Sequence, residues 1–242
     1  MGKRPPKLDM DAFLMDAPRC AGVIVDRLDV RAVRRAARDG ADVVEARVDT
    51  FSERDESALK AAFGKIKKDE TAGRVPLLLA IRSVREGGVA RIPDGERLRL
   101  FDSLMPFADA VDIELSSGNI LKDVINLAKG KGAKVIVSHH DFHKTPGTKR
   151  LRDIVKRARA YGADYVKVAA AVACREDTRR LAALLAEDGG LIVIGMGEAA
   201  RASRIFFPML GSLLTYGSMT KATAPGQMTV REIKREFKRF GI

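Results

Sequence analysis

Short runs of apolar residues recur along the whole chain, and each is followed by a charged segment with helical spacing. Eight such runs can be recognised, at 21–26, 43–49, 75–82, 110–115, 134–141, 164–170, 191–197 and 213–219. Apolar runs of this length between amphipathic segments predict β-strands that alternate with α-helices. Successive β-α-β units give parallel strands with right-handed crossovers. We therefore predict a parallel sheet covered by helices, and Thr145 with Pro146 predicts the start of the helix after the fifth strand.

The length of 242 residues fits a single (β/α)8 TIM barrel, the usual closed form of eight β-α units. An open doubly wound sheet is the alternative. No GxGxxG turn follows the first run, which disfavours the nucleotide-binding version of that sheet. No linker or change of composition divides the chain. We predict one α/β barrel domain over residues 1–242, with residues 1–19 as an N-terminal extension.

Composition and charge narrow the class of protein. No stretch approaches the roughly 20 apolar residues of a membrane span, and no apolar segment of a secretory signal follows the first basic residues. Cys20 and Cys174 lack metal-ligand spacing and are expected to be reduced, in a cytoplasmic protein. The net charge of +12 comes from 44 basic and 32 acidic residues that are interleaved. This pattern does not predict binding of nucleic acid, but it would attract an anionic small molecule.

Side chains alternate along a strand, so apolar positions that face the helices leave polar positions inside the barrel. In the second run, Val44, Ala46 and Val48 are expected to face the helices. The same alternation in the second to sixth runs places these polar residues inside: Glu45, Arg47, Asp49, Arg82, Asp112, Glu114, Ser138, His140 and Lys167. Buried ions are tolerated only when paired, and barrel chemistry resides at the carboxyl ends of the strands. The group therefore predicts an active site, with an inert salt-bridge network as the alternative.

All three histidines, His139, His140 and His143, lie close together in the fifth run and the loop after it. They could bind a metal, include a catalytic acid–base, or be polar residues without a shared role. The alternation separates His140, which points inward, from His139, and His143 falls beyond the strand. Because no familiar ligand spacing is present, we predict no metal site.

Lys167 and His140 together suggest a chemical mechanism. A lysine in an apolar strand among other cations is expected to lose its proton more readily, through desolvation and like charge. A neutral amine can attack a ketone to form an imine, and a histidine on the neighbouring strand could then remove a proton from the adjacent carbon. A salt bridge between Lys167 and an inner carboxylate is the alternative.

Six short motifs resemble those of the type I 3-dehydroquinate dehydratases of the shikimate pathway. They are EARVD (45–49), AIRSVREGG (80–88), SHHDF (138–142), DYVKVA (164–169), SR (203–204) and APGQ (224–227). Each motif alone is weak, but their order and their phase on the predicted strands are specific. The resemblance covers roughly residues 20 to 242.

The resemblance implies a (β/α)8 fold and a lyase that converts 3-dehydroquinate to 3-dehydroshikimate and water without a cofactor. Lys167 matches the lysine that forms a Schiff base with the substrate ketone. His140 matches the histidine that removes the proton and then protonates the departing hydroxyl. Glu86 matches the carboxylate that orients this histidine.

The resemblance also implies the residues that bind the substrate. Arg204 matches the arginine that grips the substrate carboxylate, and Glu45, Arg47, Arg82 and Gln227 match positions that hold its hydroxyls and carboxylate. Thr223 stands where the family often has serine, and Asp26 stands where the first strand often ends in serine. Because a carboxylate would repel an anionic substrate, Asp26 is left out of the predicted site.

The small molecule 3-dehydroquinate is the expected partner, with no nucleic acid and no membrane. Barrels of this kind often form homodimers, although no apolar stripe in the sequence marks an interface. The nearest rival function is another imine-forming barrel enzyme, such as a class I aldolase or transaldolase. A barrel whose charged interior only captures an anion is a rival of another class.

Overall fold

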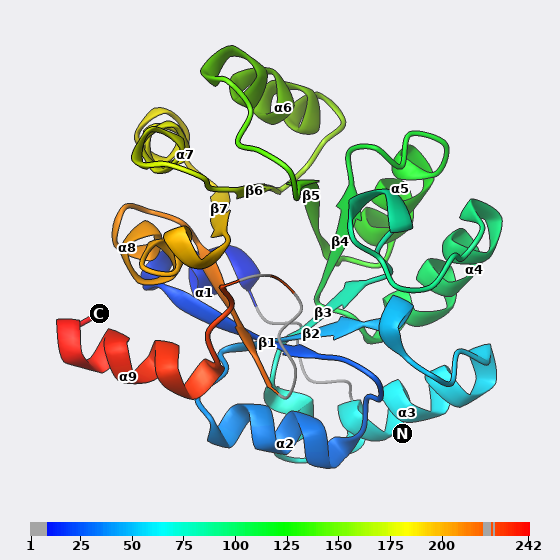
Figure 1. Cartoon of the computed structure of the whole chain (residues 1–242). Helices are drawn as coiled ribbons and strands as arrows, with labels where there is room; N and C mark the ends of the chain where they lie inside the picture. The colour runs from blue at the N-terminus through cyan, green and yellow to red at the C-terminus, as the bar shows by residue number, and fades with distance from the viewer. Residues whose placement is uncertain (1–8, 220–223, 225) are drawn as a thin grey trace.

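The computed structural model of the chain describes residues 9–219, 224 and 226–242. Its strands form one parallel sheet in the order β7-β6-β5-β4-β3-β2-β1-β8. A backbone hydrogen bond of 2.9 Å from Leu213 to Leu191 links the starts of β8 and β7, and Figure 1 views the resulting barrel along its axis. The strands are β1 (Arg19–Ile24), β2 (Val43–Arg47), β3 (Leu77–Ala80), β4 (Ala110–Glu114), β5 (Lys134–Asp141), β6 (Tyr165–Ala171), β7 (Leu191–Met196) and β8 (Leu214–Ser218).

Helices surround the barrel, and all but the first follow a strand (Figure 1). They are α1 (Met10–Asp16), α2 (Val30–Arg38), α3 (Glu56–Lys68), α4 (Asp94–Leu104), α5 (Leu121–Gly130), α6 (Thr148–Ala160), α7 (Arg175–Glu187), α8 (Ser203–Met209) and α9 (Val230–Phe240). Short 3-10 turns lie at Val48–Thr50 (η1), Ala72–Arg74 (η2), Val84–Glu86 (η3), Met105–Phe107 (η4) and Glu198–Ala200 (η5). This architecture confirms the predicted (β/α)8 TIM barrel.

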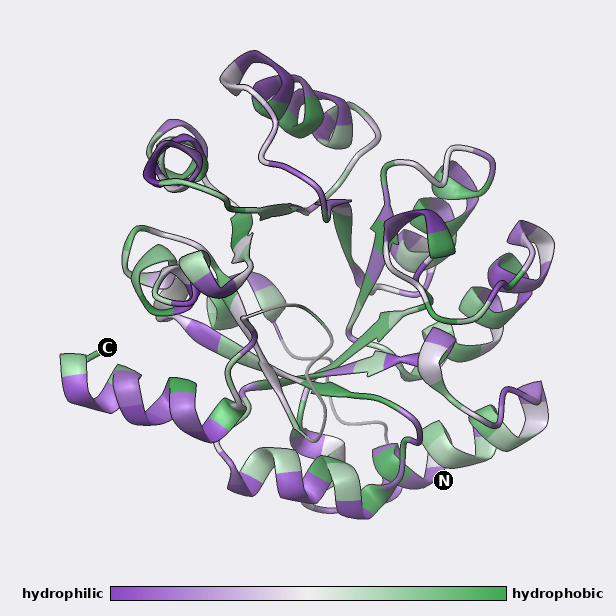
Figure 2. Ribbon diagram, viewed as in Figure 1, coloured by the Kyte–Doolittle hydropathy of each residue, from purple (hydrophilic) through white to green (hydrophobic). Residues whose placement is uncertain are grey.

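Two apolar layers hold the barrel together. The larger layer lies between strands and helices and includes Val44, Ala46 and Val48, as the alternation predicts. Burying one of these valine side chains stabilises the fold by about 1.5–3 kcal/mol. Figure 2 shows the corresponding alternation of hydrophilic and hydrophobic bands along the helices. Within the described residues, no helix is long and apolar enough to cross a membrane.

The smaller layer fills the barrel interior and is closed by α1 at the end where the strands begin. Met10 and Leu14 of α1 belong to this inner cluster together with Leu78 and Ile136. The helix is fixed by an ion pair of 2.6 Å between Asp11 and Lys134. The inner layer therefore seals one end of the barrel, and the opposite end remains available for a site.

Helix α6 begins later than the sequence predicts. Its N-cap is Gly147, and its first residue is Thr148. The hydroxyl of Thr145 donates instead to the carbonyl oxygen of Ala171 at the end of β6 (2.6 Å). Thr145 thus ties the loop after β5 to the neighbouring strand, and the prediction that it caps the helix was wrong.

Candidate active site

A cavity opens at the carboxyl ends of the strands. Its lining combines charged, aromatic and apolar side chains: Val23, Glu45, Arg47, Arg82, Glu86, Gly87, His140, Phe142, Lys167, Ala169, Ile194, Met196, Arg204, Tyr216, Ala224 and Gln227. The cavity brings together the residues that the sequence predicts for the site, except Thr223, which lies outside the described residues. The inward orientation predicted for Glu45, Arg47, Arg82, His140 and Lys167 is confirmed.

Lys167 lies on β6 and is held by two carboxylates and an aromatic ring. Its Nζ atom lies 2.9 Å from Oδ2 of Asp112 and 3.7 Å from Oε1 of Glu45. It also lies 3.9 Å from the centroid of the Tyr216 ring, where the π face attracts a cation. The sequence had pointed to cations as the neighbours of this lysine. Its contacts in the structure are instead with anions and a ring, in line with the salt-bridge alternative.

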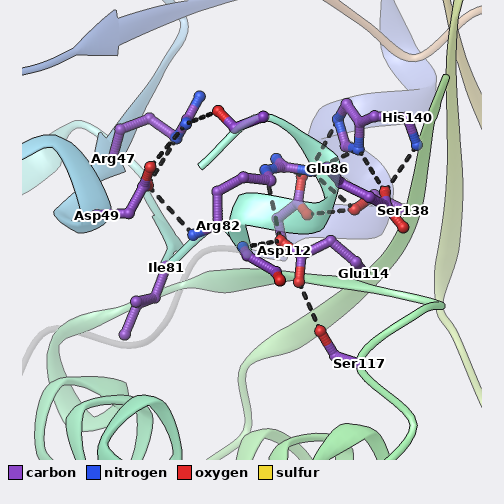
Figure 3. A network of polar contacts seen from close by, with 12 residues as sticks. Arg47, Asp49, Ile81, Arg82, Glu86, Asp112, Glu114, Ser117, Ser138 and His140 are labelled. Atoms are coloured by element: carbon purple, nitrogen blue, oxygen red, sulfur yellow. Dashed lines mark hydrogen bonds and ion pairs between the residues drawn. The ribbon is translucent and has the colours of Figure 1, made fainter. Parts of the chain in front are cut away.

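Asp112 connects Lys167 to the rest of a buried network, which Figure 3 shows in part. Oδ2 of Asp112 also accepts from Nη2 of Arg82 (3.1 Å), and Oδ1 accepts from the hydroxyl of Ser138 (2.6 Å). Burial opposes ionisation of this carboxyl. The positive charges of Arg82 and Lys167 outweigh it and hold the pKa of Asp112 far below its ordinary value.

His140 lies on β5, with Glu86 on one side and Arg82 on another. Oε2 of Glu86 accepts from the backbone N–H of His140 (2.7 Å) and lies 3.0 Å from Nδ1 of its ring. Nη1 of Arg82 lies 2.7 Å from Nδ1 and 2.8 Å from Nε2. A guanidinium can only donate, so Nε2 is the acceptor for Arg82 when Nδ1–H donates to Glu86.

The environment favours the neutral imidazole. Burial, followed by the charges of Arg82 and Lys167, lowers the pKa of His140 well below its ordinary value. Burial also raises the pKa of Glu86 to about 7, even though hydrogen bonds from Ser116 and from the backbone of His140 act against this. The pair therefore consists of a weakly basic imidazole and a carboxyl that titrates near neutral pH.

The other two histidines lie away from this cavity. His139 is half-buried on β5; burial lowers its pKa, and Arg150 and Arg157 of α6 act in the same direction. His143 is exposed in a turn where its backbone N–H donates to Asp141 (2.9 Å). Within the described ranges, no group of three His, Cys, Asp or Glu side chains is placed to hold a metal ion.

Arg47 and Arg82 share a second buried carboxylate. Asp49 accepts from Nε and Nη2 of Arg47, both at 2.9 Å, and from the backbone N–H groups of Arg82 (3.1 Å) and Val89 (3.1 Å). Burial alone would raise the pKa of Asp49, but these donors and the charge of Arg47 lower it. Asp49 thereby fixes the ends of β2 and β3 relative to each other (Figure 3).

Arg204 approaches the cavity from α8. Its Nε donates to the carbonyl of Gly226 (3.2 Å) and Nη1 to that of Tyr216 (3.4 Å). Burial lowers the pKa of Arg204 to about 10. Its Nη2 atom is buried without a hydrogen-bond partner among the described residues. A buried donor of this kind is suited to an anion.

Tyr216 and Phe142 line the cavity, although neither was among the site residues predicted from the sequence. In β8 the apolar residues face the barrel interior, since Leu214 and Tyr216 both belong to the inner apolar cluster. Gly217 faces α9, where a Cβ atom would lie 2.7 Å from the backbone nitrogen of Val230. Because α9 approaches β8 so closely, a glycine occupies the position that faces the helix, and the larger apolar side chains face the barrel interior.

The absence of a side chain on Gly87 makes room for the ring of Phe142. A Cβ atom on Gly87 would lie 2.6 Å from the Phe142 ring, which itself is nearly parallel to the His140 ring, 18° between planes and 6.5 Å between centroids. The only sequence signal for Phe142 was its place in the SHHDF motif, two residues after His140.

Buried lysine, histidine and carboxylate side chains at the carboxyl ends of a closed parallel barrel define an enzyme that acts on a small polar molecule. The family model for type I 3-dehydroquinase matches residues 23–241. A 3-dehydroquinate dehydratase of Methanosarcina barkeri is 38% identical over 212 residues, which cover 84% of this chain and 86% of the relative.

Solved structures of 3-dehydroquinate dehydratases also resemble this chain. The crystal structure of the 3-dehydroquinate dehydratase from Aquifex aeolicus has a TM-score of 0.82 at 34% identity and covers 92% of this chain and 98% of its own. That of the type I enzyme from Clostridium difficile, with covalent modified comenic acid, has a TM-score of 0.83 at 26% identity over 93% and 92% of the two chains. The chain therefore belongs to the type I 3-dehydroquinase family, the 3-dehydroquinate dehydratases of the shikimate pathway. This confirms the resemblance and makes the chain a dehydratase, a lyase.

Proposed function

We propose that the chain dehydrates 3-dehydroquinate to 3-dehydroshikimate through a Schiff base on Lys167, with His140 as the general acid–base. One observation carries this proposal: Lys167 and His140 come from the adjacent strands β6 and β5 and line the same cavity. In the register of these strands, Ser138 pairs with Lys167 and His140 with Ala169. The amine and the imidazole can therefore act on neighbouring carbons of one bound molecule.

The first stage forms the iminium. The ammonium of Lys167 passes one proton to His140, and the resulting amine attacks the ketone carbon of the substrate. His140 returns this proton to the hydroxyl of the carbinolamine, which leaves as water and gives a cationic C=N bond. Asp112 and Glu45, which lie beside the ammonium at 2.9 and 3.7 Å, would also stabilise the iminium because it carries the same charge. The iminium then withdraws electrons from the adjacent carbon and acidifies its proton.

The second stage moves one proton twice. Neutral His140 removes the proton from the carbon next to the iminium, and the resulting imidazolium gives it to the departing hydroxyl, which leaves as water. Hydrolysis of the iminium releases the product and restores Lys167. The ionised carboxylate of Glu86, 3.0 Å from Nδ1, supports the imidazolium between the two transfers.

The remaining cavity residues provide sites for the substrate's polar groups. The partnerless Nη2 of Arg204 is suited to the carboxylate of 3-dehydroquinate. Oε1 of Glu45, which accepts no hydrogen bond within the described residues, is suited to a hydroxyl. Arg47, Arg82 and Gln227 line the same space. In this proposal every reacting group belongs to the chain or the substrate.

Borohydride reduction tests the proposal. The protein is treated with sodium borohydride in the presence of 3-dehydroquinate, and the added mass is located by peptide mapping. We expect one reduced adduct on Lys167, together with ultraviolet absorbance of the conjugated product when borohydride is omitted. The covalent ligand in the Clostridium difficile relative is in line with this expectation. Turnover without any adduct, or an adduct on another lysine, would contradict it.

A further inference from the structure

We infer that Ser116 is a positioning residue for the reaction, which sets the orientation of the Glu86 carboxylate toward His140. This inference rests on the roles proposed for His140 and Glu86. Ser116 belongs to none of the family motifs in the sequence and does not line the cavity. It reaches the reacting groups only through Glu86.

The two oxygens of Glu86 have separate partners. The hydroxyl of Ser116 donates to Oε1 at 2.5 Å, whereas Oε2 accepts from the backbone and approaches the ring of His140 at 2.7 and 3.0 Å. The last torsion of a glutamate side chain is broad and roughly two-fold. A donor on Oε1 restricts that torsion and keeps Oε2 directed at the histidine.

Both ends of this contact are fixed by the backbone. Ser116 lies between Leu115, whose N–H donates to Ser138 (2.8 Å), and Ser117, whose N–H donates to Glu114 (3.0 Å). Glu86 ends the turn η3, where its own N–H donates to Ser83 (3.0 Å). The hydroxyl of Ser116 is therefore presented to Glu86 by the loop after β4, an element that carries none of the proposed reacting groups.

The contact also favours one charge state. The groups that act on Glu86 are Glu114 at the end of β4, which opposes its ionisation, and Arg82 after β3, which favours it, besides His140 on β5. A serine hydroxyl that donates to Oε1 stabilises the carboxylate. Without it, Glu86 would take up a proton at higher pH and would support the imidazolium less well.

The neighbouring serine offers a matched control. The hydroxyl of Ser117 donates to Oε2 of Glu114 (2.8 Å) and accepts from Nη1 of Arg97 (3.0 Å). Loss of this hydroxyl removes two hydrogen bonds from the same turn but none of the hydrogen bonds that Glu86 accepts. Ser116→Ala and Ser117→Ala thus separate an effect on Glu86 from a general effect on the turn.

The experiment measures kcat and KM against pH for the wild type, Ser116→Ala, Ser116→Thr and Ser117→Ala. For Ser116→Ala we expect kcat to fall roughly tenfold, the effect of one hydrogen bond to a charged group, with KM little changed. The limb of the profile that reports ionisation of Glu86 should move to higher pH. Threonine should restore both, and Ser117→Ala should leave the profile in place.

Two results would overturn the inference. One is a pH profile of Ser116→Ala that superimposes on the wild type. The other is an equal loss of kcat in both alanine variants with no movement of the limb, which would mark a purely structural role. Borohydride trapping of the same proteins separates the role of Ser116 from the proposed function. Failure to trap the wild type would contradict the Schiff base. Normal trapping, together with unchanged kinetics of Ser116→Ala, would contradict only the role of Ser116.

Discussion

Lys167 and Arg82 bind the same oxygen of Asp112, at 2.9 and 3.1 Å. One buried carboxylate therefore holds both the proposed nucleophile and the arginine that lies against His140. The position of the amine relative to the imidazole depends on a residue that need not touch the substrate.

Asp112→Asn should mainly destabilise the protein. The change would leave two buried cations without their shared anion, and breaking a buried ion pair from one side costs about 3–5 kcal/mol. The denaturant midpoint for unfolding measures this loss. Glu187→Gln, which removes an exposed pair with Arg152, is the control and should cost about 1 kcal/mol or less. Equal losses in the two variants would refute the central role of Asp112.

Lys167→Ala should abolish borohydride trapping and nearly all turnover, because no other amine lines the cavity among the described residues. Lys60→Ala, which removes an exposed lysine on α3, should trap and turn over like the wild type. Mass spectrometry and product absorbance measure the two effects. Trapping of Lys167→Ala at the wild-type level would show that the Schiff base forms on another residue.

His140→Ala should still form the trapped adduct but slow proton transfer by about 10²–10⁴-fold, the usual contribution of a general acid–base. His139→Ala provides the comparison, since that neighbouring side chain is influenced by the arginines of α6. Single-turnover kinetics with and without borohydride distinguish imine formation from proton transfer. A normal rate in His140→Ala would move the assignment to another group.

Arg204→Lys should weaken substrate capture more than it slows chemistry. Lysine retains a charge but loses the planar fork that now donates to Gly226 and Tyr216 and leaves Nη2 available. We expect KM to rise about 10-fold or more, the scale of one hydrogen bond to a charged group. Steady-state kinetics measure this, and an unchanged KM would show that this arginine does not bind the substrate.

Glu86 should make stability depend on pH. Its pKa is raised from 4.5 to about 7 in the folded protein, so the folded state binds this proton more tightly than the unfolded state. The free energy of unfolding should therefore fall as pH rises from about 4.5 to about 7, by roughly 3 kcal/mol from this group.

Glu86→Gln removes this titration while other carboxyls continue to titrate in both proteins. The stability of the variant relative to the wild type should thus increase across the same pH range. Urea unfolding at several pH values measures the difference. A difference that stays constant from pH 4 to 8, a range of about four pH units around the expected transition, would disprove the raised pKa.

The sequence predicted the barrel and much of the site because strand geometry is local and regular. Side chains alternate with a period of two, so apolar Val166 and Val168 fix Lys167 on the opposite face, and Val135 and Val137 do the same for Ser138 and His140. Assigning apolar residues to the helix layer would fail in β8, where the approach of α9 to Gly217 leaves Tyr216 inside the barrel.

The sequence by itself determined which polar side chains of the second to sixth strands enter the barrel and, through the order of its motifs, the family of the chain. Only the tertiary structure decided which of them meet. Lys167 pairs with Asp112, Glu86 is held between His140 and Ser116, and Thr145 bonds across to Ala171 instead of capping its helix. These pairings join residues from different strands and loops, so they depend on distances across the barrel that local periodicity does not specify.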